Sequence, residues 1–165
     1  HYVLTAPIHN NILSSWNWVE ALVASIPIAI LVMLIVWINQ FQDAPSDAAV
    51  GKNTWVVRTA EEGEWMKLEK PMKLYKYFMI ESFIAVAFIG VLSLFTDIGT
   101  VYAFIALAPL ALVWKAFKMA DEWMIKWNNP EADRQKVPYE LLLVNVSTIG
   151  IHFLTGLLLA AAYIL

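Results

Sequence analysis

The chain has 165 residues, 60% of them hydrophobic and only 15% charged, with a formal net charge of −3. This balance excludes an ordinary soluble domain, in which about 25% of residues are charged. The cations are interleaved with Glu and Asp, so we expect no nucleic-acid partner, and the absence of cysteine excludes thiolate metal sites. These properties predict an integral membrane protein.

The predicted elements are long apolar segments. Spanning ~30 Å of hydrocarbon takes about 20 mostly apolar residues in a helix. Four segments meet this requirement, at about residues 19–38, 78–95, 100–117 and 141–165. We therefore predict an all-α fold, a polytopic bundle of about four transmembrane helices. It forms a single membrane domain over residues 1–165, with loops at about 39–77 and 118–140.

The positive charges predict the topology. All 11 Lys and Arg residues fall within residues 52–76 and 115–136, which four helices place on one side of the membrane. The positive-inside rule assigns that side to the cytoplasm. We therefore expect a protein of the cell membrane with cytoplasmic basic loops and both termini on the opposite face.

The stretch after the first apolar segment reads NQFQDAPSDAAVGKNTWVVR over residues 39–58. Asn39, Asp43 and Asp47 recur every four residues, a spacing that places side chains along one face of a helix. Pro45 predicts that the helix breaks or restarts near Ala44, because its ring clashes with the carbonyl four residues earlier. The two carboxylates are then expected at a junction.

This stretch has the residue types that hold a metal-bound polyanion. Mg²⁺ prefers a few carboxylate oxygens together with waters and substrate phosphate oxygens. Lys52 adds a compact positive charge and Arg58 a planar fork that fits phosphate. The alternative is an ordinary charged loop, since two Asp residues four apart recur by chance. The combined pattern at the end of a membrane helix favours the metal site.

The full pattern, Asn-x3-Asp-x3-Asp-x3-Gly-Lys-x-Thr-x2-Val-Arg, resembles the second aspartate-rich motif of the UbiA superfamily. These intramembrane prenyltransferases join an isoprenyl diphosphate to an aromatic acceptor. Residues 1–7, HYVLTAP, resemble a Tyr-Thr-Ala-Pro-Pro stretch of that family, and residues 18–20 resemble a Gly-Glu-Leu that follows it. The last segment, with Asn145, His152 and Gly156, is similar to the closing helix of the 1,4-dihydroxy-2-naphthoate branch.

The resemblance implies roles for particular residues. Asp43 and Asp47 would be the catalytic, Mg²⁺-binding carboxylates, and Asn39, Lys52 and Arg58 would bind the diphosphate. Family members have about nine membrane helices, so the four here correspond to the C-terminal part of that fold. The first motif of the family, Asn-Asp-x2-Asp-x3-Asp, has no counterpart in this sequence. A missing N-terminal half or a companion membrane subunit is therefore expected as a partner.

Several residues outside the motif are weaker candidates. Trp37, Trp55 and Tyr75 would line an aromatic cavity and stabilise an allylic cation. His152 lies within an apolar run, and a hydrogen bond to a neighbouring helix is favoured over a catalytic role. Residues 59–73 would form a lid over the site. The sequence predicts interfacial anchors at Trp16, Trp18, Trp123 and Trp127.

Two classes of function remain open. In the first, the chain is the C-terminal half of an Mg²⁺-dependent prenyltransferase that acts on a prenyl diphosphate and an aromatic acceptor in quinone-type lipid synthesis. In the second, it is a non-catalytic membrane subunit that packs in a larger complex or binds a lipid or quinone. Retention of the two carboxylates with Lys52 and Arg58 favours the enzyme, whereas the absent first motif favours the subunit. A transporter is less favoured, because the broken helix pairs of inverted repeats are not evident.

Overall fold

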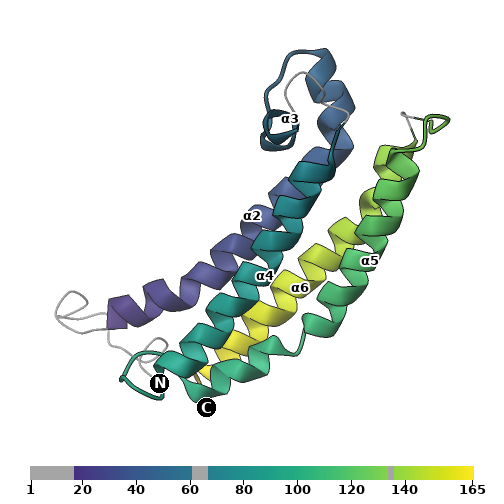
Figure 1. Cartoon of the computed structure of the whole chain (residues 1–165). Coiled ribbons are helices and arrows are strands. Elements are labelled where there is room, and N and C mark those ends of the chain that lie inside the picture. Colours follow the sequence, from purple (N-terminus) through teal and green to yellow (C-terminus); the bar gives the residue numbers. More distant parts are fainter. Residues whose placement is uncertain (1–16, 61–66, 134–135) are drawn as a thin grey trace.

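The computed structural model describes residues 17–60, 67–133 and 136–165, and within these ranges it contains helices and no strand (Figure 1). Four helices are long and apolar enough to cross a membrane, which confirms the predicted all-α class and the four spans. In chain order the elements are α2 (Asn17–Ala49), α3 (Trp55–Thr59), α4 (Glu69–Leu92), the 3-10 helix η1 (Val101–Leu107), α5 (Leu110–Trp127), the 3-10 helix η2 (Val137–Leu141) and α6 (Leu142–Ala162).

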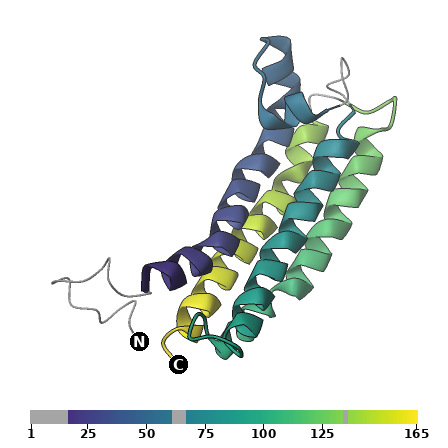
Figure 2. The same cartoon turned by 60° about the vertical axis from the view of Figure 1, so that its left-hand side comes forward.

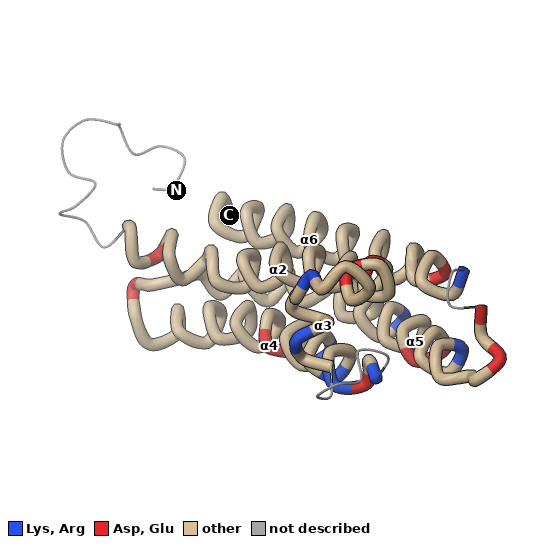
Figure 3. The backbone as a smooth tube through the Cα atoms, turned by 90° about the horizontal axis from the view of Figure 1, so that it is seen from above, with Lys and Arg blue, Asp and Glu red and all other residues tan. Residues whose placement is uncertain are grey.

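The long helices form an up-down-up-down bundle. α2 packs beside α4 and α6, α5 packs beside α6, and η1 fills the space between α4 and α6 (Figures 1 and 2). The last turns of α2, the first turns of α4, the last turns of α5 and η2 thus meet at one end, which we call the basic end. The described Lys and Arg residues gather toward it (Figure 3). Glu20, in the first turn of α2, and Asp97, after the end of α4, lie toward the other end.

The bundle is apolar both inside and outside. A large cluster of buried side chains, from Leu31 on α2 to Trp127 on α5, fills its basic half, and a smaller one around Ile89 fills the other end. Large apolar side chains such as Ile84, Phe88 and Phe153 are exposed on the outer faces of α4 and α6. A soluble monomer rarely exposes so much contiguous apolar surface. The outer faces therefore fit contact with lipid.

Three helices begin or end beyond the predicted boundaries, and the correction is largest at α2. This helix continues through Pro45 to Ala49, so the predicted break near Ala44 and the predicted start of a loop at residue 39 are wrong. Phe41 and Ala44 are fully buried, and the Ser46 hydroxyl donates to the Asp43 carbonyl oxygen over 2.9 Å. This packing offsets the cost of proline, about 3 kcal/mol in a helix interior.

The start of α4 and the end of α5 also differ from the predicted loop boundaries. α4 begins at Glu69, well before residue 78, and α5 continues to Trp127, so both connections at the basic end are shorter than predicted. Hydropathy marks the part of a helix that lies in hydrocarbon, whereas charged turns extend the same helix into the polar layer. The structure therefore places Lys70, Lys73 and Lys76 on a helix instead of a loop.

The predicted anchoring role of two tryptophans is wrong. Trp123 and Trp127 are 3% and 0% exposed, and their rings stack at a centroid distance of 5.3 Å inside the bundle. The Trp123 ring also packs edge-on against Phe41 of α2, and its Nε1 donates to the Val137 carbonyl oxygen over 2.7 Å. Trp18 is exposed, in agreement with an interfacial position, and Trp16 lies outside the described residues.

The turn between α4 and η1 gives a stability prediction. Gly99 has a φ of +89°, and a Cβ at this position would lie 2.7 Å from the Ile89 carbonyl oxygen. Gly99→Ala is therefore expected to lower the free energy of unfolding by roughly 1–3 kcal/mol, measured by denaturant titration in mixed micelles. Gly150→Ala on α6 is the matched control, because nothing lies within 4 Å of the added Cβ. Equal free energies for the two variants would contradict the prediction.

Candidate functional site

The residues that the sequence singled out lie in one continuous segment at the basic end. Asn39, Asp43 and Asp47 occupy the last three turns of α2, Lys52 lies in the turn after it, and Arg58 lies on α3. We call these five residues the carboxylate site.

The turn after α2 is held by hydrogen bonds that bring α3 back against the helix. The backbone N–H of Lys52 donates to the Asp47 carbonyl oxygen over 2.8 Å. The N–H of Val56, in the first turn of α3, donates to the Gln40 Oε1 atom over 3.2 Å. Gly51 permits the turn with a φ of +72°. Gln40 is thus a positioning residue that sequence reasoning missed, although it stands directly beside Asn39 in the motif.

Asp47 is the most confined member of the carboxylate site. Its side chain is buried, with 7% of the residue exposed, and its Oδ1 atom accepts a hydrogen bond from the Lys52 ammonium over 2.9 Å. The Oδ2 atom is also buried and has no hydrogen-bond partner within the part of the chain that the structure describes. A buried carboxylate oxygen without a partner is costly, so this atom offers a position for a further cation or donor.

Asp43 lies one helical turn before Asp47 and is exposed. The i, i+4 spacing places the two carboxylates on the same face of α2, where both can bind one ligand. Two carboxylates supply oxygen ligands of the kind that Mg²⁺ accepts, with phosphate oxygens and waters able to complete the shell. No group of three or more His, Asp or Glu side chains able to hold a metal is found among the described residues. The residues therefore fit part of an Mg²⁺ shell.

Asn39 connects the carboxylate site to the last helix. Its Oδ1 atom accepts a hydrogen bond from Asn145 Nδ2 of α6 over 2.8 Å, which leaves the Asn39 NH₂ group available to donate to a ligand. Asn145 is buried, and its Oδ1 atom has no hydrogen-bond partner in the described ranges. Sequence reasoning did not assign Asn145 to the site; the signal for it was an amide within an apolar run.

Arg58 is supported by an aromatic stack. Its guanidinium carbon lies 5.9 Å from the centre of the Trp55 ring, which stacks on Trp37 at 6.4 Å. The Trp37 Nε1 atom in turn donates to the Pro71 carbonyl oxygen over 3.2 Å, so the stack joins α3 to α2 and α4. Arg58 is exposed and makes no ion pair with another described residue. The aromatic stack therefore holds the guanidinium at the basic end, where no described carboxylate neutralises it.

Of the weaker candidates, Tyr75 and His152 lie on other helices than the carboxylate site, and only part of the predicted lid is described. Tyr75 is fully buried, and its hydroxyl shares a 2.7 Å hydrogen bond with Thr148 Oγ1, so it joins α4 to α6 within the core. His152 is half-buried on α6, and its buried Nδ1 atom has no hydrogen-bond partner among the described residues. Of the predicted lid, residues 61–66 lie outside the described residues, and Glu69 to Lys73 belong to α4. Residues 1–7, which carry part of the family resemblance, are also outside them.

The fold and the site define a class: an all-helical integral membrane protein with paired carboxylates at the basic end of its bundle. No protein-family model, curated protein or solved structure matches the chain.

Proposed function

We propose that this chain supplies one half of the site of an Mg²⁺-dependent prenyltransferase of the UbiA type. The reaction transfers an isoprenyl group from a prenyl diphosphate to an aromatic acceptor in quinone-type lipid synthesis. The observation that carries the proposal is the geometry of Asp47, whose Oδ2 atom is buried without a hydrogen-bond partner while its Oδ1 atom accepts from Lys52. Asp43, on the same face of α2, is exposed toward any ligand bound there.

The residues would act on the diphosphate in distinct ways. Asp43 and Asp47 would hold Mg²⁺, which when bound offsets the charge that develops on the departing diphosphate. Lys52 and Arg58 would donate to the diphosphate oxygens, and the Asn39 NH₂ group would donate to a third position. Lys52 is exposed and paired with Asp47, so its ammonium could donate to the substrate as well without a change of fold. The acceptor ring then forms its new bond at the allylic carbon and loses a proton.

The remaining parts of the proposal concern the assembly. The four helices would be the C-terminal part of a nine-helix fold, and the first aspartate-rich motif would come from an N-terminal half or a companion membrane subunit. The exposed Asn39 and Asp43 side chains support this arrangement, because they lie where such a partner could complete the metal shell. The basic end would face the cytoplasm of the cell membrane. The acceptor would be of the naphthoate type, as the likeness of the last helix indicates.

A second candidate is a non-catalytic membrane subunit that packs in a larger complex or binds a lipid or quinone. Its specific support is that the described residues offer two carboxylates but no third metal ligand of the His, Asp or Glu type nearby. The two candidates differ in one measurable property. A catalytic half-site binds an isoprenyl diphosphate only when Mg²⁺ is present, whereas a packing subunit shows no such dependence.

The test of the enzyme is Asp43→Ala in membranes that contain the protein with its natural partners. Mg²⁺-dependent transfer of a labelled prenyl group to an aromatic acceptor is expected to fall roughly 100-fold, because one metal ligand is removed. Asp97→Ala, at the opposite end of the bundle, is the matched control and is expected to leave the rate unchanged. Undiminished transfer in Asp43→Ala would remove the assignment of the metal site.

A further inference from the structure

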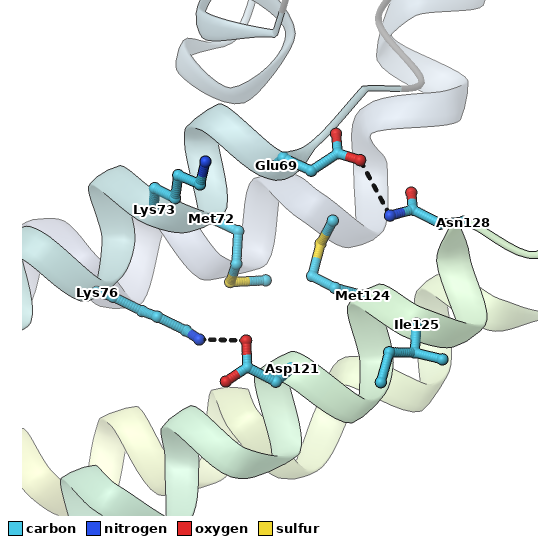
Figure 4. A pocket seen from close by; sticks show the side chains of 8 residues that line it. All are labelled: Glu69, Met72, Lys73, Lys76, Asp121, Met124, Ile125 and Asn128. Carbon is cyan, nitrogen blue, oxygen red and sulfur yellow. Dashed lines mark hydrogen bonds and ion pairs between the residues drawn. The ribbon is translucent and has the colours of Figure 1, made fainter.

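A pocket of about 310 Å³ lies between α4 and α5 at the basic end, and no residue of the carboxylate site lines it (Figure 4). The helices form a ring in which α4 packs between α2 and α5, and α6 closes the ring between α5 and α2. Met72 on α4 and Met124 and Ile125 on α5 supply the apolar part of the pocket. This volume is within the range of small-molecule sites, about 300–1,000 Å³.

Two polar bridges cross the pocket and hold the helices together. The Lys76 ammonium forms an ion pair with Asp121, and Asn128 Nδ2 donates to Glu69 Oε1 over 3.0 Å (Figure 4). The first bridge joins opposite charges and neutralises both of them. In the second, the carboxylate of Glu69 meets a neutral amide, so its negative charge is not compensated.

Lys73 lies one helical turn after Glu69, between the two bridges, and is exposed. Among the described residues it forms no ion pair. The pocket therefore presents one cation and one anion that form no ion pair with a described residue, and the i, i+4 spacing separates them by about 6 Å along the axis of α4. A ligand that fits both must carry an anion and a cation close together.

The level of the pocket along the membrane helices narrows the choice of ligand. The pocket is formed by the first turns of α4 and the last turns of α5, immediately beyond the apolar runs of these membrane-length helices. That is the level of lipid headgroups. Toward the middle of the bundle the same helices expose Ile80 and Trp114, and Phe117 packs under the Lys76 ammonium at 5.5 Å. An acyl chain can therefore follow the helices below a headgroup held in the pocket.

We propose that this pocket binds the headgroup of a membrane phosphatidylethanolamine. Lys73 donates to the lipid phosphate, Glu69 accepts hydrogen bonds from the lipid ammonium, and Met72 and Met124 contact the glycerol region. Phosphatidylglycerol lacks the cation and would meet Glu69 and Asp121 with repulsion. Phosphatidylcholine has no N–H to donate to Glu69. The proposal does not depend on the proposed function, because no residue of the carboxylate site lines the pocket.

The test uses the full chain in nanodiscs made of equal parts phosphatidylethanolamine, phosphatidylcholine and phosphatidylglycerol. Native mass spectrometry after release counts the lipids that stay bound. We expect phosphatidylethanolamine to be retained preferentially, and Lys73→Gln and Glu69→Gln each to lower its retention roughly tenfold. The matched controls are Lys70→Gln on α4 and Glu122→Gln on α5, which remove exposed charges that do not line the pocket and should leave retention unchanged.

A second variant tests the pocket without changing any charge. Met124→Trp fills the cavity and is expected to displace the lipid while the circular dichroism spectrum stays that of the wild type. Unchanged retention in this variant would overturn the proposal. So would equal retention of phosphatidylglycerol, or a loss in Lys70→Gln as large as that in Lys73→Gln, since both indicate adsorption by charge alone. Displacement of the lipid by an equal concentration of free glycerophosphoethanolamine would point to a soluble ligand and would also overturn it.

Discussion

Replacing Asp47 with alanine is expected to reduce Mg²⁺-dependent prenyl transfer by roughly 1,000-fold, a larger loss than that from Asp43→Ala. Asp47 has two functions in the carboxylate site, because its free Oδ2 atom would bind the metal while its Oδ1 atom orients the Lys52 ammonium. Asp43 is exposed and orients no described neighbour through its carboxylate. The initial rate of transfer in membranes, measured over a range of Mg²⁺ concentrations, checks the prediction.

The control for this variant is Glu140→Ala. Glu140 is also a carboxylate paired with a lysine at the basic end, since its Oε2 atom lies 2.6 Å from the Lys126 ammonium, but it is not one of the five residues of the carboxylate site. Its loss should leave the rate within twofold of the wild type, as expected for an exposed pair. The double variant Asp47→Ala with Lys52→Gln should lose little more than Asp47→Ala alone, because the two residues act as a unit. A rate for Asp47→Ala close to that of Glu140→Ala would show that the buried carboxylate has no part in catalysis.

The membrane helices are predictable from the sequence because lipid imposes a length and a composition on them. Residues 21–38 contain no charged side chain, and only a helix satisfies the backbone of such a segment in hydrocarbon. The ends of the helices are not predictable in this way. Whether α2 stops near Pro45 depends on the burial of Phe41 and Ala44 by residues far away in the chain, which local propensity does not contain.

The grouping of the carboxylate site is predictable for a different reason: its five members lie within twenty consecutive residues, so any compact local fold keeps them close. The environments of these five side chains are not predictable from the sequence. Asp47 is buried and paired with Lys52, whereas Asp43 is exposed, and the spacing of the two residues does not reveal this difference. The return of α3 onto α2 rests on the hydrogen bond between Val56 and Gln40 and on the stack of Trp55 on Trp37. The hydrogen bond between Asn145 and Asn39 joins residues 106 positions apart, and no local sequence pattern predicts it.

Trp123 shows how a correct general rule can misplace a particular residue. Aromatic residues near the ends of membrane helices are usually interfacial, and Trp123 stands near the end of α5. Its side chain nevertheless points into the bundle, where it contacts Phe41 of α2 and Trp127 of its own helix. Phe41 lies between Asn39 and Asp43 on α2, so the same aromatic cluster supports the turns that carry the carboxylates.

Trp123→Ala is therefore expected to lower the free energy of unfolding by about 3–5 kcal/mol, the cost of truncating a buried aromatic side chain. The change removes the edge-on contact with Phe41, the stack on Trp127 and the hydrogen bond that Nε1 donates to the Val137 carbonyl oxygen. It also leaves that buried carbonyl without its donor, which adds to the loss. Denaturant titration in mixed micelles, followed by circular dichroism, measures the free energy.

Two further variants separate a core role from an interfacial one. Trp114→Ala removes a tryptophan of the same helix whose side chain is 67% exposed, and it should change the free energy of unfolding by less than about 1 kcal/mol. Trp123→Phe keeps a ring against Phe41 but loses the hydrogen bond to Val137, so a smaller loss of about 1–3 kcal/mol is expected. Equal effects of Trp114→Ala and Trp123→Ala would mean that Trp123 acts at the lipid surface. The predicted order, Trp123→Ala, then Trp123→Phe, then Trp114→Ala, follows only if the aromatic cluster holds α2 against α5 beneath the carboxylate site.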